Sequence, residues 1–274
     1  MTIGNNSTPE LARRLRTHAL RMVHQAKASH IGTCLSTADL MAVLYSQVLR
    51  VDPCRPDWPE RDRFILSKGH GAAIMYAALA ERGFFDSQLL DTYCQDGSPL
   101  AGHITCQNVP GVEVSTGSLG HGLSIGCGMA LAGKRDGLPY RVFVMLSDGE
   151  LNEGSIWEAV MFASHHGLDN LVAIIDYNKW QAFGPVKEVL NLEPLAEKWR
   201  VFGWAAKEVD GHDCREISNA LGHIPFTPGK PGCLIAHTVK GKGVSFMESQ
   251  LAWHYRSPGD EDLAKALEEL ENAG

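Results

Sequence analysis

The stretch SDGELNEGSIWEAVMFASHHGLDNLVAIIDYN, residues 147–178, begins with an acid beside a glycine and ends on an asparagine. Apolar runs of the strand type end just before Asp148 and just before Asn178, and the chain between them has the pattern of a crossover helix. A right-handed strand–helix–strand unit returns the ends of its two parallel strands to one edge of a sheet. We therefore expect these two side chains to lie together at that edge.

The same alternation of strand and helix runs along the rest of the chain. Short apolar runs predict strands over residues 63–67, 141–147, 171–176, 204–209 and 233–239. Their near-continuous apolar character is typical of strands that are covered on both faces. We predict an α/β protein, a mostly parallel sheet with helices on both faces, folded as a single domain over residues 1–274. Polar, glycine-rich segments follow the strands, where open α/β sheets bind ligands.

Two helices are expected before the first strand. Ser7–Glu10 has the form of a capping box with a proline in the first turn, and apolar residues recur after it at helical spacing. Residues 36–39, Ser-Thr-Ala-Asp, have a similar form and predict that a second helix opens there. Residues 97–120 are too long and irregular for a simple connection, which indicates a functional segment.

Composition excludes several classes of protein. The chain has 274 residues, 44% of them hydrophobic, and can bury a full core. A net charge of −7 offers no basic field, so we expect no nucleic acid or anionic membrane as a partner. No apolar run approaches a membrane span, and the polar first residues lack the pattern of a signal peptide, so a cytoplasmic protein is expected. Seven scattered cysteines without a CxxC pair argue against a disulfide framework or a zinc site.

The paired strand ends have the chemistry of a magnesium site. Carboxylate and amide oxygens are hard ligands, and Mg²⁺ usually takes few protein ligands beside water and substrate phosphates. We expect Asp148 and Asn178 to be ligands, with the backbone carbonyl of Trp180 as a third. The alternative is a pair of loop residues that make turn and cap hydrogen bonds. Placement of both residues at strand ends favours the metal.

A second segment has the pattern of a phosphate cradle. Residues 116–134 carry glycines at 117, 120, 122, 126 and 128 and lead into an apolar helix. Glycines let backbone N–H groups approach an anion at a helix N-terminus, where the dipole also favours negative charge. Two alternatives stay open: close packing of a glycine-rich helix, and a degenerate dinucleotide fingerprint in GHGLSIG, residues 120–126.

Several ordered motifs resemble one family. They are SDG with YN (147–149 and 177–178), AKASHIG (26–32), SKGHG (67–71), AGH (101–103), VEVSTGSLGHG (112–122), DGELNEGSIWEA (148–159) and TVKGKGVSFME (238–248). From about residue 10 to about residue 260 the chain is similar to the N-terminal, diphosphate-binding section of transketolases. The resemblance implies the thiamine diphosphate-binding fold, with thiamine diphosphate and Mg²⁺ as cofactors.

The resemblance also implies roles for individual residues. Four histidines match those that ring the family's active site: His30, His70, His103 and His254. His103 would meet the donor ketose, His30 and His70 would lie near the diphosphate and the reacting carbon, and His254 would contact diphosphate or sugar. Any single histidine could instead have a surface or capping role.

Other matching positions concern the cofactor and an interface. Gly117 and Gly149 would approach the diphosphate, and Leu119 would flank the aminopyrimidine ring. Glu153 and Glu158 match acids that line a subunit interface between active sites, their alternative being a solvated helix face.

Some positions depart from the family pattern. Ser147 replaces a glycine before Asp148, Ser29 and Ile31 replace the neighbours of His30, and Ala182 and Phe183 stand where the family often has Ile-Asp. Tyr255 follows His254, which leaves the register of that histidine open. These changes bear on sugar specificity more than on cofactor binding.

The family also has a pyrimidine-binding domain and a third domain, and we expect neither within residues 1–274, which show no second array of alternating strands and helices. The resemblance therefore implies the small subunit of a split transketolase whose pyrimidine-binding, C-terminal section is a partner chain. We expect a two-fold symmetric α2β2 heterotetramer, because the family builds each active site between subunits.

The implied reaction transfers a two-carbon ketol unit from a ketose to an aldose. Whether the sugars carry phosphate or sulfonate stays open. Three alternatives remain: another thiamine diphosphate enzyme such as a deoxyxylulose phosphate synthase or a dihydroxyacetone synthase, a nicotinamide-dependent oxidoreductase, and a non-catalytic scaffold subunit.

Overall fold

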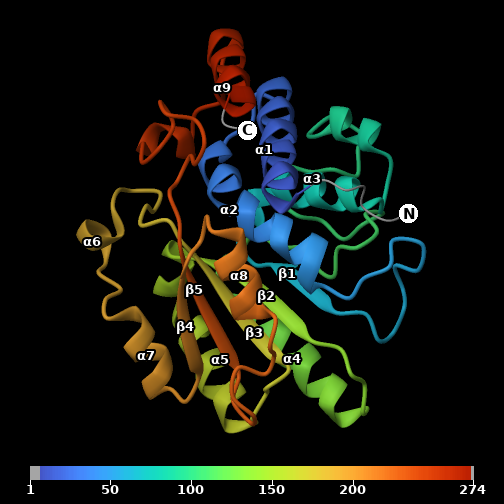
Figure 1. The fold of residues 1–274 in the computed structure, drawn as a ribbon, viewed down its shortest axis with the longest axis vertical. Coiled ribbons are helices and arrows are strands. Elements are labelled where there is room, and N and C mark those ends of the chain that lie inside the picture. The colour runs from blue at the N-terminus through green and yellow to red at the C-terminus, as the bar shows by residue number, and fades with distance from the viewer. Residues whose placement is uncertain (1–6, 273–274) are drawn as a thin grey trace.

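Five parallel strands form the centre of the structure, a computed structural model that describes residues 7–272 (Figure 1). They are β1 (Arg63–Leu66), β2 (Val142–Ser147), β3 (Leu171–Tyr177), β4 (Ala205–Asp210) and β5 (Gly232–His237). The order across the sheet is β1-β2-β3-β5-β4, and each neighbouring pair is parallel. The predicted α/β fold is confirmed, and the five predicted strands agree with these bounds to within two residues.

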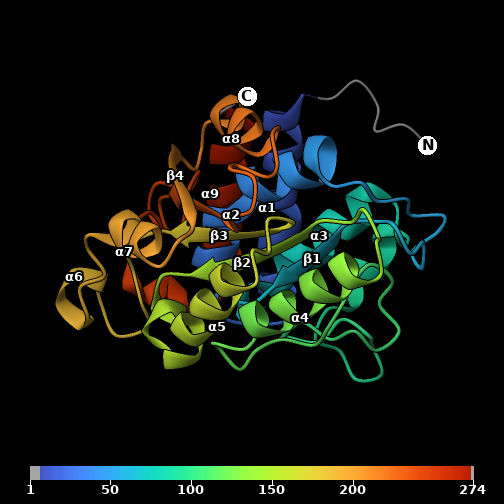
Figure 2. The same ribbon diagram turned by 90° about the horizontal axis from the view of Figure 1, so that it is seen from below.

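Helices cover both faces of the sheet (Figure 2). One layer contains α1 (Thr8–Gln25), α2 (Ile31–Val43), α3 (Ala72–Arg82), α8 (Cys214–Leu221) and α9 (Asp260–Asn272). The other contains α4 (Gly122–Arg135), α5 (Gly154–His165) and α7 (Leu195–Val201), and the short α6 (Val186–Val189) lies beside the sheet. Shorter helical turns occupy Leu44–Val48, Gly69–Gly71, Ser87–Thr92, Gly149–Asn152 and Leu251–His254.

Side chains of the strands alternate between two hydrophobic layers. On β2, Phe143 and Met145 pack toward α1, α2 and α3, while Val142, Val144 and Leu146 pack toward α4 and α5. A strand has a side-chain period of two, so a central strand that is apolar at every position serves both layers. This explains why the predicted strands show no polar alternation.

The register of β2 and β3 positions the polar residues that follow them. Ser147 pairs with Asp176, so Asp148 and Asn178 leave the sheet at the same edge. The helix α5 makes the connection between the two strands. The sequence prediction that this unit brings the two side chains to one edge is confirmed.

The starts of the first two helices differ from the predicted capping boxes. Ser7 is the N-cap of α1, but its side chain makes no capping hydrogen bond, and Glu10 pairs with Arg13 instead. The predicted start of a second helix at Ser36 is wrong, because α2 begins at Ile31. The Ser36 hydroxyl donates to the Asp176 carboxylate at 2.8 Å, so it is used by a tertiary contact inside the helix.

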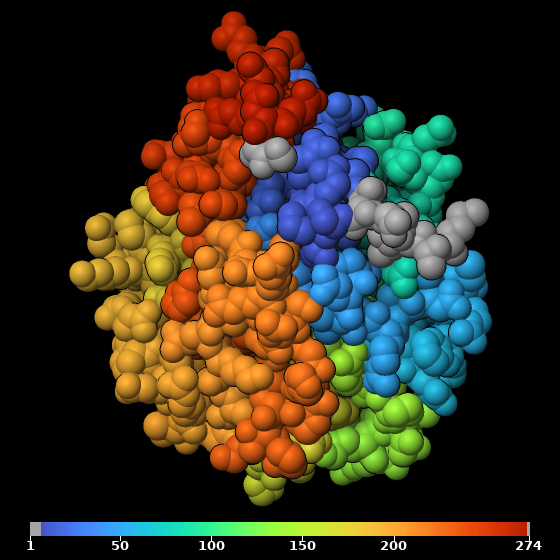
Figure 3. All heavy atoms as spheres, viewed as in Figure 1, coloured from blue at the N-terminus to red at the C-terminus, as the bar shows by residue number. Residues whose placement is uncertain are grey.

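Figure 3 shows the face formed by the blue N-terminal helices, the orange segment around α8 and the red C-terminal helix. The helices α1 and α9, from opposite ends of the described chain, pack against each other there. Among the helices within residues 7–272, none combines the length and apolarity that crossing a membrane requires. All seven cysteines are unpaired.

Candidate active site

A cavity of about 450 Å³ opens at the carboxyl edge of the sheet. Its walls come from segments that follow four of the strands: His70 after β1, Asp148 after β2, Asn178 after β3 and Lys240 after β5. The irregular segment 97–120 contributes His103, Gly117 and Leu119 to the same cavity. Residues 97–120 thus help to form the cavity, which is consistent with the expectation that they do more than connect two elements.

Four histidines from separate parts of the chain meet in this cavity. The ring centroid of His30 lies 5.2 Å from that of His70, 5.9 Å from that of His103 and 5.0 Å from that of His254. The rings of His70 and His254 are 6.1 Å apart. His103 is exposed, whereas the other three are half-buried. The cluster therefore has a deep part and an outer part.

The three deeper histidines are uncharged at neutral pH. Burial, aided by His103 and Lys240, lowers the pKa of His30 to about 4. Burial and the neighbouring Lys240 lower the pKa of His254 to about 3, and burial with Lys68 holds the pKa of His70 well below its usual range. A neutral imidazole donates one hydrogen bond and accepts another, so these rings can bind sugar hydroxyls and anionic oxygens.

The backbone holds His30 in an uncommon conformation. With φ at 72° and ψ at 20°, His30 is left-handed and immediately precedes α2. Its N–H donates to the His254 carbonyl oxygen at 3.0 Å, and its Nδ1 lies 3.2 Å from the Ser29 hydroxyl. Such a conformation costs about 1–3 kcal/mol outside glycine and is frequent at functional sites. It directs the His30 ring into the cavity.

The buried carboxylate of Asp148 has no cationic partner among the described residues. One oxygen accepts from the Gly149 N–H at 2.8 Å and the other from the Lys179 N–H at 2.7 Å. Burial, together with the nearby Asp176, raises the pKa of Asp148 to about 7. A cation bound beside it would relieve the cost of burying this negative charge.

Two hydrogen bonds orient the amide of Asn178. Its Nδ2 donates to Asp176 at 3.0 Å, and its Oδ1 accepts from the Trp180 N–H at 3.1 Å. Both Asn178 and Trp180 line the cavity with Asp148. Within residues 7–272 no three His, Cys, Asp or Glu side chains are grouped to hold a metal. A cation beside Asp148 would therefore also need amide or backbone carbonyl oxygens as ligands. This donor set fits Mg²⁺, which completes its shell with water and phosphate oxygens.

The glycine-rich segment divides into a cavity part and a packing part. Gly117 lines the cavity, and a Cβ on Gly120, where φ is 87°, would lie 2.6 Å from the Ser155 hydroxyl. Further along α4, a Cβ on Gly126 would lie 2.5 Å from Val144 of β2. The close-packing interpretation thus applies to Gly126. A dinucleotide fingerprint needs a strand directly before it, and here loop residues precede α4.

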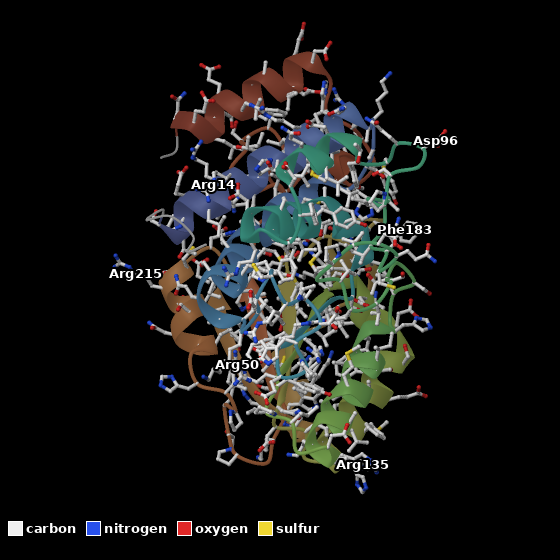
Figure 4. The ribbon with its side chains drawn as sticks, turned by 90° about the vertical axis from the view of Figure 1, so that its right-hand side faces the viewer. Arg14, Arg50, Asp96, Arg135, Phe183 and Arg215 are labelled. Atoms are coloured by element: carbon white, nitrogen blue, oxygen red, sulfur yellow. The ribbon has the colours of Figure 1, made fainter. Side chains whose placement is uncertain are left out.

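The remaining predicted site residues have clear positions. Gly149, Leu119 and Glu153 line the cavity with the residues already described. Glu153 is the N-cap of α5 rather than a residue within that helix, and Glu158 is exposed on α5 and does not line the cavity. Phe183, from the segment after Asn178, is 85% exposed at the cavity edge and projects from the molecule in Figure 4.

Sequence reasoning missed the buried charges beneath the site. Lys68 is fully buried, and its ammonium donates to Asp176 and to the Thr33 hydroxyl, both at 2.6 Å. Asp176 also accepts hydrogen bonds from Thr238 and Asn178. Its carboxylate therefore connects the carboxyl ends of β1, β3 and β5. Lys240, 1% exposed, lines the cavity beside His254. Both lysines lie in motifs that carry the family resemblance, SKGHG and TVKGKG, and the position of each lysine just after a strand was the signal that could have indicated them.

Comparison with protein families and curated proteins gives consistent matches. Residues 7–272 match the family model described as transketolase, thiamine diphosphate binding domain. The 6-deoxy-6-sulfo-D-fructose transketolase subunit of Clostridium sp. (strain MSTE9) is 44% identical over 260 residues, covering 95% of this chain and 94% of that protein. One of the subunits of the apulose-4-phosphate transketolase of Phocaeicola vulgatus is 44% identical over 255 residues, covering 93% and 90%.

Solved structures give the same match. The chain aligns with transketolase from Leishmania mexicana with a TM-score of 0.90 and 32% identity, covering 97% of this chain and 41% of that one. Transketolase from Campylobacter jejuni gives a TM-score of 0.90 and 30% identity, covering 96% and 42%. This chain therefore spans about two fifths of the length of the solved transketolases it matches.

Proposed function

The chain belongs to the transketolase family as its thiamine diphosphate-binding part, and on that premise we propose that it is the small subunit of a two-polypeptide transketolase. As a single diphosphate-binding domain, it would bind Mg²⁺ and the cofactor diphosphate and help transfer a two-carbon ketol unit from a ketose to an aldose. The observation that carries the proposal is the convergence of four histidines with Asp148 and Asn178 on one cavity.

In this function the sheet edge holds the metal and the diphosphate. The Asp148 carboxylate, the Asn178 amide oxygen and the Trp180 carbonyl oxygen are the proposed ligands of Mg²⁺. Gly117 and Gly149 leave room for phosphate oxygens close to the backbone. When bound, thiamine diphosphate supplies the electron sink for cleavage of the ketose carbon–carbon bond.

The histidines orient the sugar above that platform. His30, His70 and His254 are neutral and half-buried, which suits hydrogen bonds near the diphosphate and the reacting carbon. His103 is exposed in the outer part of the cavity, where the terminal hydroxyl of a donor ketose would enter. Holding the sugar in one geometry lowers the entropic part of the barrier.

The names of two relatives support an anionic sugar and a partner chain. Both are named as subunits, one of a sulfofructose transketolase and one of an apulose phosphate transketolase. We propose a pyrimidine-binding partner, an α2β2 assembly and contact through the surface that carries Glu153 and Glu158. The two relatives are named for different anionic sugars, a sulfo sugar in one and a sugar phosphate in the other.

Metal-dependent cofactor binding tests this proposal. Thiamine diphosphate is titrated by calorimetry into the chain mixed with its partner, once with Mg²⁺ and once with a chelator. We expect binding with Mg²⁺ and its loss with the chelator, since the diphosphate would then face the Asp148 carboxylate without a cation between them. Equal affinity under both conditions would contradict the metal site.

Replacement of His103 by alanine should lower the rate of ketose cleavage by about tenfold, the value of one hydrogen bond to a charged or reacting group. Cofactor affinity should change little, because His103 lies in the outer part of the cavity. Steady-state rates and cofactor titration measure the two effects separately. His121→Ala is the matched control, since His121 is also exposed and lies in the neighbouring glycine-rich segment but does not line the cavity. An equal loss of cofactor binding would refute this division of roles.

A further inference from the structure

The contact between Lys240 and His254 has no role in the function described so far. Lys240 Nζ lies 3.1 Å from Nδ1 of His254. The lysine is almost completely buried, and a Cβ on Gly32 would come within 3.1 Å of its Cγ. The loop that carries Lys240 is fastened to the start of α2, where the Gly241 N–H donates to the Gly32 carbonyl oxygen at 2.9 Å. The lysine stem therefore has one packed position.

The charge states decide the direction of this hydrogen bond. Burial lowers the pKa of Lys240 to about 8, with Asp148 opposing the shift, so the ammonium is the main form at pH 7. An ammonium can only donate, so Nδ1 of His254 must accept. Because His254 is neutral at this pH, its ring proton is then on Nε2.

We infer that Lys240 is a positioning residue that holds His254 as the neutral tautomer protonated on Nε2. The backbone fixes the ring from the other side, since the His254 carbonyl oxygen accepts from the His30 N–H at 3.0 Å. His254 then presents an N–H donor of fixed direction to the cavity that it lines.

This assignment limits what His254 can do. A ring with its lone pair engaged by an ammonium cannot serve as a base through Nδ1, and its Nε2–H can only donate. The fitting ligand atom is an oxygen with available lone pairs, on a sugar or on a diphosphate. That consequence for the ligand rests on the proposed function, whereas the tautomer itself does not.

The tautomer is measured by ¹⁵N NMR of the full chain labelled on its histidine rings. Long-range ¹⁵N–¹H spectra distinguish a ring protonated on Nε2 from one protonated on Nδ1, and the His254 signals are assigned by their loss in His254→Gln. We expect Nε2–H in the unmodified chain, a mixture of tautomers in Lys240→Met, and recovery of Nε2–H in Lys240→Arg. Lys242→Met is the matched control, because Lys242 is in the same motif but outside the cavity lining.

A double-mutant cycle gives a second readout in the assembled enzyme at saturating Mg²⁺ and cofactor. Lys240→Met should raise the ketose KM by about tenfold, the loss of one hydrogen bond, and should add nothing in the His254→Ala background. His254 protonated on Nδ1 in the unmodified chain, or a tautomer unchanged by Lys240→Met, would overturn the inference. Absence of transfer in an assembly whose NMR result is as expected would instead overturn the proposed function.

Discussion

Replacement of Asp148 by alanine should weaken Mg²⁺-dependent binding of thiamine diphosphate by more than about a hundredfold. Loss of a residue that only supports a metal ligand already costs about 10–100-fold in metal affinity. Asp148 is the charged member of the proposed ligand set, and water that replaces it would have neither its charge nor its fixed position. The two backbone N–H groups that hold the carboxylate, from Gly149 and Lys179, show how strictly that position is set.

Calorimetric titration of the assembled enzyme at saturating Mg²⁺ measures this effect. Asp148→Asn keeps an oxygen without its charge and should lose less affinity than Asp148→Ala. Asp210→Ala is the matched control, since Asp210 is the last residue of β4, is exposed and does not line the cavity. Equal affinities in all three variants would remove the metal assignment. Loss of affinity in Asp210→Ala alone would point to a general disturbance of the sheet edge.

The parts of the fold that the sequence predicted well depend on short-range patterns. A fully buried parallel strand is apolar at every position, so β2 and β3 stand out as continuous runs. A helix between two strands makes them parallel, and the carboxyl ends of parallel strands lie at one edge, which places Asp148 and Asn178 together without knowledge of any tertiary contact. The four histidines were also predicted from local sequence, because each lies in an ordered motif that follows a strand or occupies a loop.

Features that depend on partners distant in sequence were not predictable from such patterns. Ser36 looks like an N-cap, yet its hydroxyl is bound by Asp176, 140 residues away in the sequence. Lys68 lies within a recognised motif, but nothing local shows that it is buried against the same carboxylate. Its burial is tolerated because the ion pair and a hydroxyl satisfy the ammonium.

The position of Glu158 shows a limit of a different kind. A match to a family motif assigns a residue to an interface, but the partner surface is needed before its contacts can be seen. Glu158 is exposed on α5, five positions after Glu153 at the helix start. Only Glu153 lines the cavity, so the two acids do not share one position relative to the site.

No ketol transfer is expected from the purified chain alone or from its partner alone, and full activity is expected only when the two are mixed. The described chain offers the proposed metal ligands and glycine-bordered space for a diphosphate, and Leu119 is the residue matched to the aminopyrimidine ring. Under the proposed division, the partner must hold the far side of that ring. Without that contact the ring would be poorly oriented and the reacting carbon would be open to water.

The assay measures transfer from a ketose donor to an aldose acceptor by each chain separately and by the mixture, with phosphorylated and sulfonated ketoses as parallel donors. Activity with one donor class and not the other would identify the anion that the site accepts. A mixture containing the Asp148→Ala variant serves as the inactive control, because that variant should assemble normally yet bind the cofactor poorly. Robust transfer by the chain alone would refute the split-enzyme proposal. A mixture that binds the cofactor but transfers from neither donor would favour a different thiamine diphosphate reaction, because the metal site and the sugar site are carried by different residues.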